Sequence, residues 1–113
     1  GRHITFMARL MKDFGYTTIV NGIGVDEETA VCIDAAGMGK VYGLNNAYFL
    51  KNTTLAAETC VSGSPLTWNR NAQAITAYRI AGSATGNGSF NASNWTFSGG
   101  TSYYYYVSNG VLF

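Results

Sequence analysis

The chain has 113 residues, of which 47% are hydrophobic and only 12% are charged, and its formal net charge is +1. This length suits one small domain, and so small a net charge gives no reason to expect a nucleic acid as partner. No apolar run reaches the roughly 18 residues that a membrane-spanning helix needs, so no membrane span is expected. Asn, Ser, Thr and Gly take the place of the charged residues that most proteins carry. Such a composition favours a secreted or extracellular setting.

The first predicted element is an amphipathic helix over Arg2–Phe14. Its apolar residues recur at helical spacing while the charged residues fall off that stripe, and Gly15 follows as a stop signal. An apolar stripe of this kind must be buried, and we expect it to pack against a sheet. The residues of the stripe are Ile4, Phe6, Met7, Leu10, Met11 and Phe14.

Strands follow on either side of an acidic turn. Thr17–Val25 is β-branched and continuous, as expected of a strand buried on both faces. Thr29–Ile33, Lys40–Gly43 and Ala47–Lys51 are predicted as the next strands. The acidic turn contains Asp26, Glu27 and Glu28, which could bind a cation or hold a base, although consecutive carboxylates at a strand end more commonly form a solvated turn.

The second half of the chain begins with the loose segment Cys60–Pro65, which is the best internal boundary. Leu66–Trp68 and Ala72–Ile80 then alternate as strands do. Thr101–Val107 and Gly110–Phe113 predict a hairpin, because Asn-Gly at its tip suits a type I′ turn. The predicted fold is therefore α+β and rich in strands, with one N-terminal helix packed on a sheet and a C-terminal β-hairpin.

Two cysteines and four acceptor motifs for N-glycans are present. Cys32 and Cys60 could form one disulfide, or both could be buried thiols. With one His and no CxxC motif, no zinc or other metal site is expected, and no cofactor is predicted. Gly82–Asn94 is interpreted as a loop that would hold acceptors in solvent. The motifs begin at Asn52, Asn87, Asn91 and Asn94.

No residue makes a convincing catalytic nucleophile. Ser62 and Ser64 lie in a glycine-containing loop but lack the GxSxG context of a nucleophile elbow. His3 stands beside Arg2, and nothing supports it as a general base. We predict no catalytic residue in this chain.

Tyr103–Tyr106 is the most distinctive aromatic segment, and a strand would place two of its phenols on each face. It could be a sheet strand with one face in the core. Alternatively, it could be an assembly strand, because uncharged aromatic strands with an exposed edge recruit other chains.

The sequence GIGVDEETAVCID, followed by KVYG and NAYFLK, resembles the cyanophycinase-like serine peptidases. RHITFMARLMKD resembles the Arg-rich helix of that family, and SPLTWNRNAQAITAYRI with SFNASNW resembles the C-terminal strands of its secreted members. The resemblance implies a remnant of a three-layer α/β sandwich, related to class I glutamine amidotransferases. Residues 1–60 would be the C-terminal part of the peptidase-like domain, and residues 61–113 a β-rich extension packed on it.

The family's Ser nucleophile and catalytic His would both precede Gly1, so neither role is carried over to this chain. The resemblance implies that Arg2 and Arg9 flank the parental substrate pocket, and that Asp26 and Glu27 give structural support near the parental site.

We therefore expect a non-catalytic C-terminal fragment of a secreted protein of this family, whose partner is itself or the missing N-terminal half. Self-association would build a structural extracellular assembly. The alternative is the smaller chain of a nicked, active serine peptidase that needs the missing half. A third hypothesis is a carbohydrate- or surface-binding module that uses Trp68, Trp95 and the tyrosine run.

Overall fold

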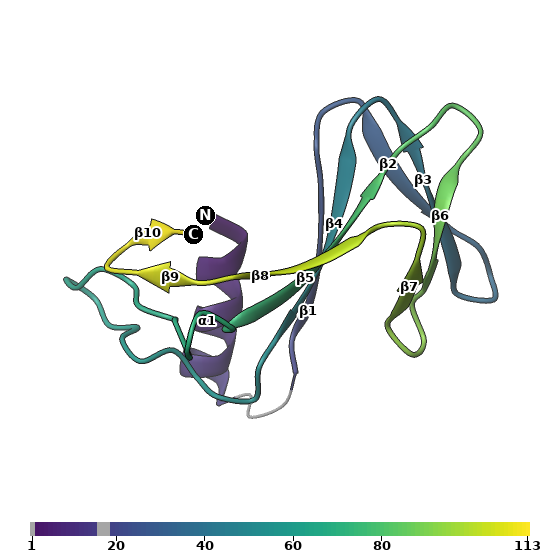
Figure 1. Ribbon diagram of the computed structural model, residues 1–113. Helices are drawn as coiled ribbons and strands as arrows, with labels where there is room; N and C mark the ends of the chain where they lie inside the picture. The colour runs from purple at the N-terminus through teal and green to yellow at the C-terminus, as the bar shows by residue number, and fades with distance from the viewer. Residues whose placement is uncertain (1, 16–18) are drawn as a thin grey trace. The chain divides into compact units, whose positions relative to one another are not determined.

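The computed structural model describes residues 2–15 and 19–113, which form one helix and ten strands (Figure 1). The fold is α+β and rich in strands, as predicted. The chain divides into two compact units. The first unit comprises residues 1–22, 50–77 and 103–113, and the second comprises residues 23–49 and 78–102. Each unit thus takes residues from both sides of Cys60.

The helix α1 (Arg2–Phe14) belongs to the first unit and matches the predicted bounds. It ends at Gly15, whose φ of 65° is a conformation that glycine adopts without steric cost. One face of α1 is buried through Ile4, Met7, Ala8 and Met11. Phe6 and Phe14 remain 67% and 70% exposed, so only part of the predicted stripe is covered. No helix within the described residues has the length and apolar character to cross a membrane.

Four strands form a sheet in the order β1-β4-β5-β8. Their bounds are β1 (Asn21–Val25), β4 (Asn46–Asn52), β5 (Ile75–Ala81) and β8 (Thr101–Tyr105). All four strands pass from one unit into the other. In β4, the buried residues of the second unit are Ala47 and Phe49, and those of the first unit are Leu50 and Asn52. The buried side chains of β4 are therefore the odd-numbered ones up to Phe49 and the even-numbered ones from Leu50, where the strand passes into the first unit.

The strand β5 shows the same change. Ile75 and Ala77 are buried in the first unit, whereas Ile80 is buried in the second and Arg79 is exposed. The predicted alternation of side chains along this strand is correct. The buried residues of β5 belong to two cores instead of one. Odd-numbered residues are buried in the first unit, and an even-numbered residue is buried in the second.

A second four-stranded sheet lies within the second unit and has the order β2-β3-β6-β7. Its strands pair antiparallel. The strand bounds are β2 (Thr29–Ile33), β3 (Met38–Gly43), β6 (Asn87–Asn91) and β7 (Thr96–Ser98). In the turn between β2 and β3, Asp34 Oδ1 accepts hydrogen bonds from the backbone of Ala36 and Met38, both at 2.9 Å.

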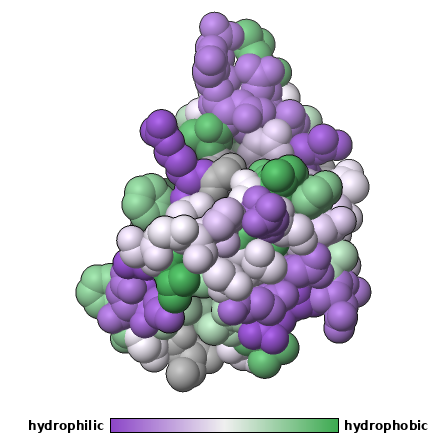
Figure 2. All heavy atoms as spheres, turned by 90° about the vertical axis from the view of Figure 1, so that its left-hand side faces the viewer, coloured by the Kyte–Doolittle hydropathy of each residue, from purple (hydrophilic) through white to green (hydrophobic). Residues whose placement is uncertain are grey.

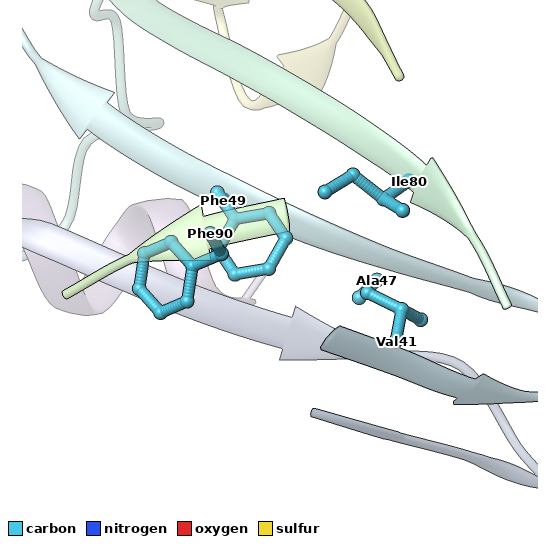
Figure 3. Packing of buried hydrophobic residues seen from close by; sticks show 5 residues of the cluster. All are labelled: Val41, Ala47, Phe49, Ile80 and Phe90. Atoms are coloured by element: carbon cyan, nitrogen blue, oxygen red, sulfur yellow. The ribbon is translucent and has the colours of Figure 1, made fainter. Parts of the chain in front are cut away.

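The core of the second unit is a cluster of five buried residues, shown in Figure 3. The rings of Phe49 and Phe90 are 4.5 Å apart between centroids, and Phe97 stacks on Phe90 at 5.7 Å. Such aromatic pairs stabilise a core beyond the area they bury. The five residues are Val41, Ala47, Phe49, Ile80 and Phe90, with Val31, Tyr78, Trp95 and Phe97 packed against them.

Three strand predictions need correction. The strand predicted at Thr17–Val25 begins at Asn21, and Thr17 and Thr18 lie outside the described residues. It is not buried on both faces, because Asn21, Ile23 and Val25 on one face are exposed, Val25 to 51%. Leu66–Trp68 forms isolated bridges instead of a regular strand. The loop predicted at Gly82–Asn94 contains β6.

The C-terminal hairpin is confirmed. It consists of β9 (Val107–Ser108) and β10 (Val111–Leu112), which pair antiparallel. Asn109 and Gly110 between them have φ values of 49° and 82°, as a type I′ turn requires. The predicted strand Thr101–Val107 is interrupted at Tyr106, so the tyrosine run is divided between β8 and the approach to the hairpin.

Candidate functional site

The tyrosine run lies at the edge of a sheet, because β8 is the last strand in its order. Tyr103 and Tyr105 are half-buried, with hydroxyl oxygens 3.1 Å apart and rings in a T-shaped contact at 5.1 Å. Tyr104 lies between them and is 50% exposed. Tyr106 falls outside the strand and stacks on Phe113 at 5.1 Å. The run therefore presents one exposed phenol on the strand, not two on each face.

This edge is also uncharged. No Asp, Glu, Lys or Arg follows Arg79 in the sequence, so β8 and the hairpin carry no charged side chain. Edge strands are normally protected against pairing with other chains by charge, proline, bulges or short length. The edge strand β1 runs directly into Asp26-Glu27-Glu28, β2 lies between Glu28 and Asp34, and β7 has three residues. The five-residue strand β8 is longer than β7 and carries neither charge nor proline.

The acidic turn has a structural role in the second unit. Asp26 Oδ2 accepts hydrogen bonds from the backbone N–H of Asn46 at 3.1 Å and the hydroxyl of Tyr48 at 3.3 Å. The Asp26 N–H in turn donates to Asn46 O at 3.0 Å. Glu27 has an exposed side chain, and its carbonyl accepts from Asn45 Nδ2. The carboxylate of Asp26 therefore fixes the turn to the start of β4.

The first unit contains a groove of about 490 Å³ bounded by α1, the segment 60–66 and the hairpin. This volume falls within the range of small-molecule sites. Arg9 lines the groove and pairs with Asp13 at 2.8 Å, whereas Arg2 is exposed and is not part of the lining. Besides Arg9, the lining consists of Thr5, Cys60, Val61, Ser62, Ser64, Leu66, Val107, Gly110 and Leu112.

A carboxylate clamp in the first unit was not predicted from the sequence. Both oxygens of Glu58 lie 3.2 Å from the Asn69 N–H, and Oε2 also accepts from the Arg70 N–H at 3.2 Å. Arg70 Nε lies 3.3 Å from Glu58 Oε1. Burial raises the pKa of Glu58, but the backbone hydrogen bonds and the Arg70 charge outweigh it and hold that pKa below its ordinary value.

The clamp holds a left-handed turn of three successive residues that are not glycine. Arg70, Asn71 and Ala72 have φ values of 45°, 59° and 62°. Asn69 Oδ1 accepts from the Ala72 N–H at 2.7 Å and closes the turn. Non-glycine residues avoid this conformation unless surrounding contacts impose it. Of the three residues, only Asn71 is of a type that commonly adopts this left-handed conformation. It is therefore the only one whose identity in the sequence indicates the turn.

The cysteines do not form a disulfide in this structure. Cys32 is exposed on β2 in the second unit, and Cys60 is buried in the first. Cys32 lies opposite Lys40 in the register of β2 and β3. Within the described ranges, no group of three or more His, Cys, Asp or Glu side chains could hold a metal ion.

Two tryptophans and one glycan acceptor are placed differently from what their proposed roles require. Trp68 is fully buried and donates through Nε1 to Leu55 O at 3.1 Å, so it cannot stack on a bound sugar. Trp95 packs edge-on against Phe90 at 5.1 Å. Asn52 is only 3% exposed, which leaves no room for a glycan in the folded chain.

Comparison with protein families, with curated proteins and with solved structures finds no match for this chain. The resemblance to cyanophycinase-like peptidases stays a prediction from the sequence. The uncharged edge of β8 is the most distinctive feature of the candidate functional site.

Proposed function

We propose that this chain is a non-catalytic structural protein that self-associates outside the cell through the edge of β8. One observation carries the proposal above all others. An edge strand of five residues, with Tyr104 half-exposed, has no charge and no proline to prevent pairing with a second copy. The low share of charged residues supports an extracellular setting, as it does in the sequence interpretation.

The physical reason is that an edge strand presents alternate backbone N–H and C=O groups to solvent. A second copy can supply the complementary groups when two such edges meet antiparallel around a two-fold axis. Each facing pair of side chains then contributes roughly 0.2–1 kcal/mol. Because neither copy carries a charge along this segment, no electrostatic repulsion opposes their approach.

Exposed apolar residues continue along the chain from this edge. Val111 and Phe113 of the hairpin segment are 55% and 56% exposed. On the face shown in Figure 2, however, hydrophobic residues form separate patches between polar ones. Apolar residues scattered in this way are ordinary on a protein surface. We therefore assign the association to strand pairing, with the hairpin as additional contact area.

The decisive variant is Tyr104→Lys, measured by sedimentation velocity over a range of protein concentrations. The unmodified chain is expected to form dimers through paired β8 edges, and negative-stain electron microscopy distinguishes these from filaments, which would need a second contact. Tyr104→Lys is expected to sediment as a monomer, because a charge on each copy would face its counterpart across the new pair. Tyr104→Phe should still associate.

A matched control separates the site from the general effect of charge. Ala35→Lys adds the same charge at an exposed position in the turn between β2 and β3, outside the sheet that contains β8, and should leave association unchanged. A chain that stays monomeric at every concentration would refute self-association. Equal association of Tyr104→Lys and the unmodified chain would refute the assignment to β8.

A further inference from the structure

We propose that the turn between β6 and β7 is a site of N-glycosylation with Asn94 as the acceptor, and that Asn52 is not an acceptor despite its sequence motif. This inference rests on the extracellular setting of the proposed function, but it does not depend on self-association. Four acceptor motifs are present, and their surroundings in the structure differ enough to rank them.

The reaction requires an accessible side-chain amide with a hydroxyl group two residues further along the chain. Asn Nδ2 forms a bond to C1 of the first sugar, which arrives on a lipid-linked oligosaccharide. The bond from C1 to the pyrophosphate of that carrier breaks, and Nδ2 loses a proton. A bulky polar glycan then remains on the asparagine, so the folded chain must keep that side chain in solvent.

Asn94 meets these requirements. Its residue is exposed in the turn that joins β6 to β7. Thr96 Oγ1 donates a hydrogen bond to Asn94 Oδ1 at 2.7 Å, so the amide and the hydroxyl of the motif are in contact. Among the hydrogen bonds of the described residues, none uses Asn94 Nδ2, the atom that would carry the sugar.

The turn is held in place from its buried side. Trp95 has a φ of 55°, and its N–H donates to Asn91 O at 2.9 Å. Its ring packs edge-on against Phe90 at 5.1 Å and Phe97 at 5.7 Å. The Ala92 N–H donates to Gly37 O at 2.8 Å. Neighbouring residues thus anchor the turn, and Asn94 is not needed for its packing.

The other two motifs of the second unit are more constrained. Asn91 Oδ1 accepts from both Ser93 N at 3.0 Å and Ser93 Oγ at 2.6 Å, and the residue is half-buried. Asn87 is exposed, but its Nδ2 donates to Ala81 O at 2.7 Å. Asn87 ranks behind Asn94 because its Nδ2 already donates to the backbone, and Asn91 ranks behind because it is half-buried in β6.

Asn52 is incompatible with a glycan in the folded first unit. Its Oδ1 accepts from the Val20 N–H at 2.6 Å, and its Nδ2 lies 2.7 Å from Met11 Sδ on α1. A sugar on Nδ2 would break the contact with Met11, which is itself buried. Folding therefore selects against chains that carry a glycan at this position.

The test is secretion of the full chain from cultured eukaryotic cells behind an added export signal, followed by mass measurement of the intact protein and its peptides. We expect a glycan at Asn94 and none at Asn52. An amidase that releases N-glycans should leave Asp in place of Asn at position 94. Thr96→Val should remove the glycan, whereas Thr96→Ser should keep it, because Ser retains the hydroxyl.

Two outcomes would overturn the inference: an unmodified Asn94 in the secreted, folded protein, or a glycan at Asn52 in that same material. Asn94→Gln should remove one glycan, and Asn52→Gln should not change the mass of the attached sugar. The added signal delivers the chain to the glycosylation machinery whatever its natural location. Failure at Asn94 is therefore distinct from failure of the proposed self-association, which the Tyr104→Lys variant tests by itself.

Discussion

The two units are stabilised in different ways. The second unit packs Phe49, Phe90 and Phe97 into a cluster of rings between short antiparallel strands. The first unit relies as well on polar contacts, such as those of the buried Asn52 and of the partly exposed Glu58, to hold its irregular segments. Aromatic packing tolerates loss of any single hydrogen bond, whereas a unit held by polar contacts depends on each of them being made.

The largest test of this difference is Phe90→Ala in the second unit. Phe90 is fully buried and contacts the rings of Phe49, Trp95 and Phe97, so its loss creates a cavity. The free energy of unfolding should fall by about 3–5 kcal/mol. Denaturant unfolding gives this value, and hydrogen exchange shows where protection is lost.

The comparison predicts that protection falls first for amides of residues 23–49 and 78–102. Equal loss in both units would contradict it, because the chain would then behave as one cooperative block. Phe6→Ala is the matched control. The same atoms are removed from a side chain that is 67% exposed, so the expected change is within about 0.5 kcal/mol.

A buried amide is the corresponding weak point of the first unit. Asn52→Ala leaves the Val20 N–H without the acceptor that it has at 2.6 Å. An unsatisfied donor in the interior costs about 1–3 kcal/mol, and because the Val20 N–H is part-buried, the free energy of unfolding should fall by about 1 kcal/mol. Gln73→Ala removes a similar amide from an exposed position and should have little effect. If both variants unfold at the same denaturant concentration, the polar contacts of Asn52 do not stabilise the first unit.

Local sequence rules predicted the parts of the fold that depend on neighbours in the chain. The bounds of α1 follow from its apolar spacing and from Gly15, and the hairpin turn follows from Asn109-Gly110. The strand at Thr29–Ile33 was predicted with its observed bounds, because it lies between two turns with recognisable residues. These features need no knowledge of distant contacts.

The features that sequence did not reveal depend on residues far apart in the chain. Asn52 is buried because Val20 and Met11 meet its amide, and nothing in its motif indicates this. The left-handed turn after Asn69 exists because the carboxylate of Glu58 holds its N–H groups. The candidate site shows the same division: the tyrosine run is evident in the sequence, but its place at a sheet edge is set by strand pairing.

The smallest expected effect concerns pH and the Glu58 clamp. The pKa of Glu58 in the folded chain lies below its ordinary value of 4.5. A lowered carboxyl pKa stabilises the folded state fully above the ordinary pKa, and this contribution is lost as the pH falls through the lowered value. Unfolding of the first unit should therefore become easier as the pH falls below the ordinary carboxyl pKa and through the lowered one, and the effect should be modest because the side chain is 36% exposed. Glu58→Gln keeps the shape of the side chain but cannot ionise, so denaturant midpoints measured across this range should change less with pH than those of the unmodified chain.

Glu27→Gln, at an exposed carboxylate outside the clamp, should retain the full pH dependence. An unchanged slope in Glu58→Gln would show that the first unit does not depend on this ionised contact, and the contrast between the two units would then rest on Asn52 alone.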